Sequence, residues 1–274
     1  MDRLPLIGTD EHKTLFCRTF IDTHDPYSPA AVVFPQLDDA SHTRLRSLPV
    51  WNEAVNTERE TAFKVQRMAT QERDPLMREA IALQGFEEGR HATLLDRLTE
   101  RYAIPVQRRA PERVATDPTW EFTRTEYGEC FDAFFAFGLF AIARDSGFFP
   151  PSLVLLFDPI MQEEARHVLF FVNWIAHRRA QLARWARPLL DFRRGLALTL
   201  QILSRVRTAL DLGGTAQDNF TMKSHGALGD FSIRTFLETC LRENDRRLGI
   251  YDRRLLRPHF APTAARWALR VLHR

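Results

Sequence analysis

Hydrophobic side chains recur at intervals of three and four residues over long stretches of the chain, which is the spacing of amphipathic helices. The first such run begins at Leu48 and stops at Asp74-Pro75, and a second run extends from there to about Tyr102. Proline disfavours a helical conformation in the residue before it, so Asp74-Pro75 separates two helices. Because the connection is short, the two runs predict an antiparallel helical hairpin.

The same scheme repeats after a polar linker over 105–117. A third helix is predicted over 119–145, where Ser146-Gly147 ends it. A fourth helix follows Pro150-Pro151, with a restart or kink at Asp158-Pro159. Two similar hairpins predict a four-helix bundle, and the sequence shows no strand pattern of any weight.

The segments outside the two hairpins have different patterns. Residues 1–45 contain four prolines among scattered apolar residues, which predicts an irregular arm over the core. Residues 180–210 and 231–248 predict further amphipathic helices separated by a loop at Gly213-Gly214, and the remainder from residue 249 predicts a docking tail. We therefore expect an all-α fold. Its expected parts are an N-terminal arm (1–45), a four-helix bundle (46–180) and a basic helical C-terminal extension packed on the bundle (181–274).

Composition places the chain among folded globular proteins, because 45% of its 274 residues are hydrophobic and 27% are charged. Cys17, Cys130 and Cys240 are far apart and form no CxxC pair. A disulfide framework and a rubredoxin or zinc-ribbon site are therefore excluded, and a reducing compartment is indicated. Residues 1–13 contain acids and no long apolar run, so we expect no secretory signal there, and no segment approaches the ~20 apolar residues that span a bilayer. We therefore expect a cytoplasmic protein.

The charge is unevenly distributed along the chain. Residues 1–177 hold 19 Lys and Arg against 27 Asp and Glu, whereas residues 178–274 hold 19 against 8. Such a basic region is a candidate contact for a polyanion, and its helix around Arg193 and Arg194 is a candidate contact for an anionic membrane. We favour packing of this helix on the bundle over contact with a nucleic acid or a membrane surface.

The strongest local signal is a duplicated string, EEGRH ending at His91 and EEARH ending at His167. Residues i and i+3 share a helix face, so Glu88 and His91 point a carboxylate and an imidazole at one spot. Glu164 and His167 do the same on the fourth helix. One Glu-x-x-His is common by chance, but two of them, each central in the apolar stripe of an equivalent helix, indicate two chelating half-sites.

A dimetal site in a four-helix bundle takes one further carboxylate from each of the other two helices. Facing residues of an antiparallel hairpin are equidistant from its turn, and Asp74-Pro75 lies near the midpoint between Glu58 and Glu88. Glu60 fits the turn nearly as well, but its helix face is polar and is predicted to face solvent. Glu58 is therefore the expected ligand. The other residues on the face of Glu60 are Glu53, Asn56, Thr57, Lys64 and Arg67.

The same geometry applies to the second hairpin. Ser146-Gly147 lies midway between Glu129 and Glu164, so Glu129 is the expected ligand of the third helix. Glu126 and Asp132 lie one turn away on nearly the same face and are the alternatives.

Four carboxylates that converge in an apolar bundle repel one another, and each buried ion is costly unless it is paired. Two divalent ions balance four carboxylates, and two neutral imidazoles complete the coordination. Mixed oxygen and nitrogen donors favour iron or manganese over a thiolate-seeking metal. We therefore predict a dimetal site with a defined set of ligands. The predicted ligands are Glu58, Glu88, His91, Glu129, Glu164 and His167.

On these residues the sequence resembles the ferritin-like di-iron carboxylate superfamily, which includes rubrerythrins, bacterial multicomponent hydroxylase subunits, ubiquinone-pathway hydroxylases and aldehyde deformylating oxygenases. The resemblance covers about residues 48–178. It implies two iron ions, with Mn/Fe as the alternative. It also implies that Glu87 orients His167 and that Glu163 orients His91 across the bundle.

Two arginines match the family pattern, and three positions depart from it. Arg90 and Arg166 match the arginine that often precedes the histidine in this family, although an ion pair on the helix surface is the simpler explanation. Leu95 stands where ribonucleotide reductase subunits place a radical tyrosine, so a radical store is not expected. Ala133 replaces the threonine of multicomponent hydroxylases, and Ile160 replaces the extra histidine of arylamine oxygenases. Glu243 on a later helix is a candidate extra ligand.

The resemblance implies that a reduced iron pair binds O2 and oxidises a substrate. We expect an O2-dependent di-iron oxygenase or oxidase that acts on a small, apolar or acyl-type molecule, with electrons from a separate reductase and with a homodimer as a candidate assembly. The alternatives are a ferroxidase or peroxide-scavenging protein and a tRNA-modifying hydroxylase that uses the basic region. Many phenylalanines crowd the second hairpin, and we expect most of them to be core and the rest to be candidates for a substrate channel.

Overall fold

The computed structural model describes residues 4–48, 50–110, 116–210 and 232–272. Over these ranges the chain forms α-helices and short 3-10 turns, and no strand occurs in them. The expected all-α class is therefore confirmed. The predicted loop at Gly213-Gly214 lies outside the described residues.

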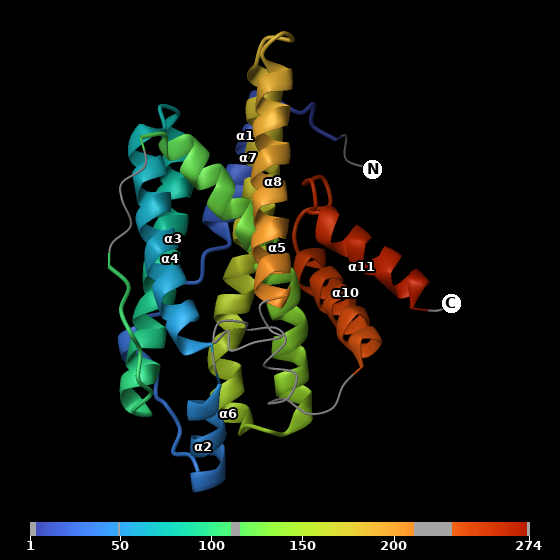
Figure 1. Cartoon of the computed structure of the whole chain (residues 1–274). Coiled ribbons are helices and arrows are strands. Elements are labelled where there is room, and N and C mark those ends of the chain that lie inside the picture. Colours follow the sequence, from blue (N-terminus) through green and yellow to red (C-terminus); the bar gives the residue numbers. More distant parts are fainter. Residues whose placement is uncertain (1–3, 49, 111–115, 211–231, 273–274) are drawn as a thin grey trace.

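Four helices surround the centre of the molecule (Figure 1). They are α3 (Trp51–Gln71), α4 (Pro75–Arg101), α5 (Pro118–Ser146) and α7 (Asp158–Gln181). Helix α3 packs along α4 and α5 packs against α7, while α3 also contacts α5 and α4 contacts α7. The four helices therefore enclose one common interior.

Local sequence sets the ends of these helices as expected. The Asp74 carboxylate caps α4 by accepting hydrogen bonds from the backbone N–H groups of Leu76 at 3.0 Å and Met77 at 3.1 Å. Helix α5 ends at Gly147, which has a φ of 69°, a left-handed conformation that glycine adopts without strain. The connection to α7 contains α6 (Pro151–Val154) and the 3-10 turn η2 (Leu155–Phe157). The predicted restart at Asp158-Pro159 is the start of α7.

The prediction of an irregular N-terminal arm was wrong. Residues Asp10–Asp22 form helix α1 and Asp39–Ser47 form helix α2, with a 3-10 turn η1 at Pro29–Ala31 between them. Helix α1 packs against α7 and α4, and its buried face includes Phe16 and Phe20. The prolines of this region lie before and after α1 and not inside it, so they leave room for a regular helix.

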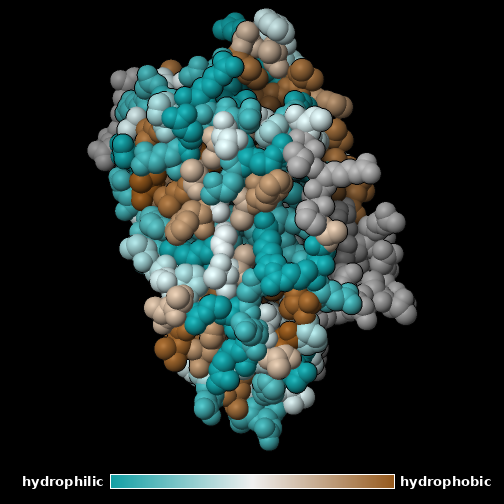
Figure 2. All heavy atoms as spheres, turned by 90° about the vertical axis from the view of Figure 1, so that its left-hand side faces the viewer, coloured by the Kyte–Doolittle hydropathy of each residue, from teal (hydrophilic) through white to brown (hydrophobic). Residues whose placement is uncertain are grey.

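Within its described residues the C-terminal extension forms helices α8 (Arg187–Leu210), α10 (Ile233–Gly249) and α11 (Phe260–Val271). Helices α8 and α10 both pack on α5, and α11 packs on α10 and α5. The predicted tail after residue 249 therefore contains a helix. No helix in the ranges given above is both long and apolar enough to cross a membrane. Figure 2 shows a mostly hydrophilic face on the side of α3 and α4.

Two apolar cores occupy the interior. The first joins α1 to α3, α4, α5 and α7 around Phe16, Met68 and Trp174, and the second joins α3, α4, α5 and α10 around Trp51, Leu98 and Phe134. Most of the phenylalanines of the second hairpin are buried in these cores, as expected. The buried members are Phe122, Phe131, Phe134, Phe137, Phe140, Phe149, Phe170 and Phe171.

The contact between α5 and α10 generates a stability prediction. A Cβ at Gly138 would lie 2.3 Å from the sulfur of Cys240 and 3.2 Å from its backbone. Gly138→Ala therefore pushes α10 away from α5, and we expect the free energy of unfolding to fall by about 1–3 kcal/mol, the usual cost of overpacking. Urea denaturation measures this change.

Gly195→Ala in α8 is the matched control, because a Cβ at Gly195 meets no described atom within 4 Å. Alanine is the better helix former, so this variant should keep or raise the stability of the protein by up to about 1 kcal/mol. Equal stability of the two variants would contradict the close packing of α5 on α10.

Candidate metal centre

The two Glu-x-x-His pairs meet in the interior between α4 and α7. The side chains of Glu88, His91 and His167 are almost fully buried, and Glu164 is 7% exposed. One oxygen each from Glu58, Glu88 and Glu164 and one ring nitrogen of His91 all lie within 4.8 Å of one another. This buried group can hold a metal ion.

The distances give each carboxylate a position relative to the two imidazoles. Nδ1 of His91 lies 3.3 Å from Oε2 of Glu58 and 3.3 Å from Oε1 of Glu164. Nδ1 of His167 lies 3.0 Å from Oε1 of Glu88 and 3.7 Å from Oε2 of Glu164. Glu88 also reaches His91, with 3.9 Å between its Oε2 and Nδ1. Glu88 and Glu164 therefore lie between the imidazoles, whose ring centroids are 5.8 Å apart.

The donor atoms at the centre lack hydrogen-bond partners among the residues that the structure describes. Nδ1 of both histidines and one carboxylate oxygen each of Glu58, Glu88 and Glu164 are buried and accept no hydrogen bond from them. Buried polar atoms are nearly always satisfied, so a cluster of unsatisfied lone pairs that face one another needs an explanation. Metal ions at the centre would satisfy these atoms, and oxygen and imidazole donors suit iron or manganese.

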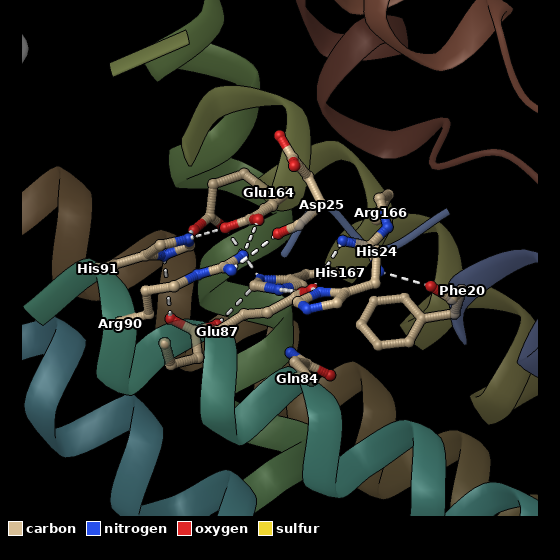
Figure 3. Close-up of polar contacts among 12 residues, drawn as sticks. Phe20, His24, Asp25, Gln84, Glu87, Arg90, His91, Glu164, Arg166 and His167 are labelled. Atoms are coloured by element: carbon tan, nitrogen blue, oxygen red, sulfur yellow. Dashed lines mark hydrogen bonds and ion pairs between the residues drawn. The ribbon is translucent and has the colours of Figure 1, made fainter. Parts of the chain in front are cut away.

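The other nitrogen of each imidazole contacts a carboxylate from the opposite motif (Figure 3). Nε2 of His91 donates to Oε2 of Glu163 at 2.7 Å, and Nε2 of His167 donates to Oε2 of Glu87 at 2.9 Å. With the proton on Nε2, each Nδ1 carries the lone pair that a metal needs. These are the crossed pairs that the family resemblance implied.

Arg90 and Arg166 are buried, so the simpler explanation of a helix-surface ion pair was wrong. Arg166 Nη1 donates to Oε1 of Glu87 at 2.8 Å, and Arg90 forms the equivalent ion pair with Glu163. Each arginine thus pairs with the carboxylate that holds a histidine. The outer carboxylates, Glu87 and Glu163, have arginine partners, whereas the structure gives the inner carboxylates Glu58, Glu88 and Glu164 none among its described residues.

The N-terminal segment covers the outer layer of the centre, which consists of Glu87, Glu163, Arg90 and Arg166. Arg166 donates to the carbonyl oxygen of Phe20 at 2.5 Å, and Arg90 donates to the carbonyl oxygens of Asp25 at 2.8 Å and Tyr27 at 3.0 Å. The guanidinium of Arg90 also lies over the Tyr27 ring, with its carbon 3.8 Å from the ring centroid. Residues 20–27 were not expected to contribute, because nothing in their spacing indicates a contact with α4 and α7.

A second group of metal-binding residue types consists of His24, Glu87 and Glu163. Nδ1 of His24 lies 2.5 Å from Oε1 of Glu87. Both carboxylates of this group already pair with an arginine and a histidine. Their charge is balanced without a metal, so we assign this group to the outer layer of the centre.

On α3, the structure brings Glu58 to the centre and turns Glu60 away. Glu60 forms ion pairs with Lys64 at 3.8 Å and Arg109 at 3.7 Å. The prediction that this face of α3 is solvent-exposed was wrong for Asn56 and Lys64, which are buried. Segment 104–110 covers part of the face, because Asn56 donates to the Gln107 carbonyl and accepts from the Arg109 N–H.

On α5, two carboxylates are close to the centre. Glu126 is fully buried and accepts a hydrogen bond from Gln84 at 2.7 Å, while its other oxygen has no hydrogen-bond partner within the described ranges. Glu129 is partly exposed and accepts a hydrogen bond from Thr61 at 3.2 Å. The third candidate, Asp132, is exposed. Both glutamates therefore stay open as the ligand from α5, and the interior contains one carboxylate more than the four that were predicted.

Glu243, the candidate extra ligand, lies elsewhere. Its carboxylate forms ion pairs with Arg246 at 2.8 Å and with Arg144 at 3.7 Å, between α10 and α5. Because its charge is balanced there, we do not assign it to the metal centre.

Without a bound metal, the carboxyl groups of the centre differ in how strongly they hold a proton. Burial raises the pKa of Glu58 to about 8, and burial together with the neighbouring Glu164 and Glu88 raises the pKa of Glu129. Burial opposes ionisation of Glu87 as well, but His167 and Arg166 overcome it and hold the pKa of Glu87 far below its usual range. Glu58 and Glu129 thus favour a proton or a cation, and Glu87 is an anion.

Comparison of the chain with family models, with curated proteins and with solved structures found no match. The assignment of the centre therefore rests on its geometry and its donor atoms.

Stability of the metal-free protein is expected to fall as the pH rises from about 4.5 to about 8. In this window folded Glu58 retains a proton that the unfolded chain has released, so raising the pH favours unfolding. Glu126, Glu129 and both imidazoles of the centre have raised pKa values and act with the same sign. Urea denaturation across the window measures the slope, which Glu58→Gln should reduce and the exposed Glu79→Gln should leave unchanged. A flat or rising stability would show that the folded centre does not retain these protons.

The outer layer generates a prediction about metal affinity. Glu87→Gln keeps the shape of the side chain but removes the anion that holds His167, so we expect affinity for Fe(II) or Mn(II) to fall about 10- to 100-fold. Competition with a chelating dye measures the affinity. Glu79→Gln, an exposed change on the same helix, is the control. Unchanged affinity in Glu87→Gln would show that this carboxylate does not support the site.

Proposed function

We propose that this protein is a ferritin-like di-iron carboxylate enzyme that uses O2 to oxidise a small, apolar or acyl-type substrate, with electrons from a separate reductase. The observation that carries the proposal is the convergence of two Glu-x-x-His pairs from α4 and α7 on one buried spot. Their inward-facing donor atoms have no hydrogen-bond partners in the part of the chain that the structure describes. Such a donor set matches a pair of divalent ions in number, charge and chemistry.

The distances suggest how the residues would share two ions. His91 and Glu58 would bind one ion, and His167 with Glu126 or Glu129 would bind the other. Glu88 and Glu164, which face both imidazoles, would bridge the pair. A reduced iron pair supplies the reaction with O2 when it is bound.

The chain's own contribution is orientation and exclusion of water. Glu87 and Glu163 hold the imidazoles by Nε2, and Arg166 and Arg90 form ion pairs with those carboxylates. The two apolar cores enclose the centre and restrict access of water to it.

The surroundings favour an apolar substrate. Leu95 and Ala133 are buried and stand one turn after His91 and Glu129 on the same helix faces. Neither side chain offers a hydroxyl or a phenol, so these two positions supply no radical store or hydroxyl relay. Access is best on the side of α3 and α5, because the Glu58 side chain is 21% exposed and Glu129 is partly exposed.

The same two acidic side chains favour a second candidate function. Partly exposed carboxylates next to a buried centre offer Fe(II) a path from solvent, as a ferroxidase needs. Iron would then be the substrate and not a resident cofactor. An oxygenase consumes an organic substrate and a ferroxidase consumes Fe(II), so one experiment separates the two functions.

The test begins with metal content. Protein reconstituted anaerobically with Fe(II) should bind about two ions per chain, and Glu88→Ala and His167→Ala should each lose most of this metal. Glu60→Ala is the matched control, because Glu60 lies on α3 but faces away from the centre. Full metal content in either of the first two variants would contradict the proposed ligands.

The second measurement is O2 uptake by the Fe(II)-loaded protein. An oxygenase keeps its iron, and its O2 uptake continues with an electron donor and stops without one. A ferroxidase consumes O2 in proportion to added Fe(II) well beyond its bound complement. No O2 uptake beyond that of free Fe(II) under either condition would contradict both functions.

A further inference from the structure

The outer face of α8 is exposed and apolar from its first turn to Leu203. Large hydrophobic side chains recur on it at the spacing of one helix face, beginning with Trp185 in the turn before the helix. The stripe consists of Trp185 (85% exposed), Leu189 (66%), Phe192 (68%), Leu196 (40%), Leu200 (41%) and Leu203 (57%). From Arg187 to Leu203 the helix extends for about 25 Å at ~1.5 Å per residue.

The positions between these residues on the exposed face are also uncharged. They are Pro188, Gly195 and Thr199. A Cβ at Gly195 would meet no atom of the described residues within 4 Å, so the middle of the face is open. A continuous exposed apolar surface of this kind marks an interaction site in a folded protein.

The opposite face of α8 holds the helix in place. Ala197 is fully buried against the neighbouring helices. Arg194 donates to the Tyr127 hydroxyl at 2.9 Å, and Gln201 donates to the Arg124 carbonyl at 2.7 Å, both on α5. Because these contacts fix the rotation of α8, the apolar stripe cannot turn toward the core.

Basic side chains border the stripe. Residues 181–203 contain four arginines and one acid, Asp191, which pairs with Arg179 and Arg194, while Arg193 pairs with Asp117 at the start of α5. Arg184 is exposed at the start of the helix. Leu6 and Ile7 line a surface hollow of about 360 Å³ together with Arg187 and Arg194, and Leu6 is 75% exposed. The N-terminal segment therefore adds apolar surface beside the same arginines.

The arginines beside the stripe distinguish two candidate partners, a second copy of the chain and an anionic lipid surface. A second copy of the chain, related by a two-fold axis, would bring two arginine-bordered stripes together, and like charges would then face each other. An anionic lipid surface instead takes the apolar side chains into its acyl boundary and pairs its phosphates with the arginines. An aromatic residue at the end of such a stripe, like Trp185, suits the headgroup level.

We propose that the exposed face of α8 from Trp185 to Leu203 binds the surface of an anionic phospholipid membrane. The helix lies in the plane of the headgroups while its inner face stays on α5. The protein does not cross the bilayer in this arrangement. The inference does not rest on the metal centre, so it can hold or fail independently of the proposed function.

Flotation with vesicles tests the proposal. The full chain should bind vesicles of phosphatidylcholine mixed with phosphatidylglycerol, bind phosphatidylcholine alone more weakly, and release as salt screens the arginines. The double variant Leu189→Glu/Phe192→Glu should weaken binding at least about tenfold, because it places charge at the apolar boundary. Circular dichroism and metal content should stay unchanged, since both side chains are exposed.

Phe63→Glu is the matched control, because Phe63 is 50% exposed on α3 and lies outside the stripe. Tryptophan emission supplies a second readout. Anionic vesicles should shift it to shorter wavelength, and the shift should be much smaller in Trp185→Phe, which still binds.

Three results would overturn the proposal. They are absence of binding to anionic vesicles, equal binding by the double variant and the wild type, and a solution dimer that the double variant dissociates while neither form binds vesicles. The last result would assign the stripe to a second copy of the chain.

Discussion

The charge of the buried centre is the constraint on which the rest of this structure depends. Glu58, Glu88 and Glu164 converge on one point, and among the described residues none of them forms an ion pair with a lysine or an arginine. The nearest arginines pair with the outer carboxylates Glu87 and Glu163 instead. This separation leaves the interior with unsatisfied lone pairs that only protons or added cations can satisfy.

The rest of the fold supports this polar layer. Apolar cores on both sides exclude water, and the crossed contacts of the two motifs tie α4 to α7 through buried hydrogen bonds. The N-terminal segment completes the arrangement, because the carbonyl oxygens of Phe20, Asp25 and Tyr27 accept hydrogen bonds from the buried arginines. A buried network of this kind specifies one arrangement of the helices, since a shift of any member leaves a charge unpaired.

Helix α5 connects the centre to the C-terminal extension. One face carries Glu126 and Glu129, while glycines elsewhere on the helix allow other helices to approach closely. A Cβ at Gly128 would lie 3.3 Å from the Gln201 side chain of α8, and Gly138 lies against Cys240 of α10. The extension is thereby fixed to the bundle by one of its faces. The apolar outer face of α8 lies opposite that attachment, because Ala197, Leu198 and Ile202 face the bundle on the same side as the hydrogen bonds of Arg194 and Gln201.

The sequence by itself determined the helices, the hairpin turns and the two Glu-x-x-His pairs, because these depend on local periodicity, on proline and on i,i+3 geometry. It also selected Glu58 over Glu60, since the distance from the turn and the helix face are both local. The helix over 10–22 also has a local signal, since Thr9 caps it and His12, Phe16 and Phe20 recur on its buried face. Only the tertiary structure decided that Arg90 and Arg166 are buried and that Glu126 joins the interior. Each of these depends on contacts between residues far apart in the chain, for which periodicity carries no signal.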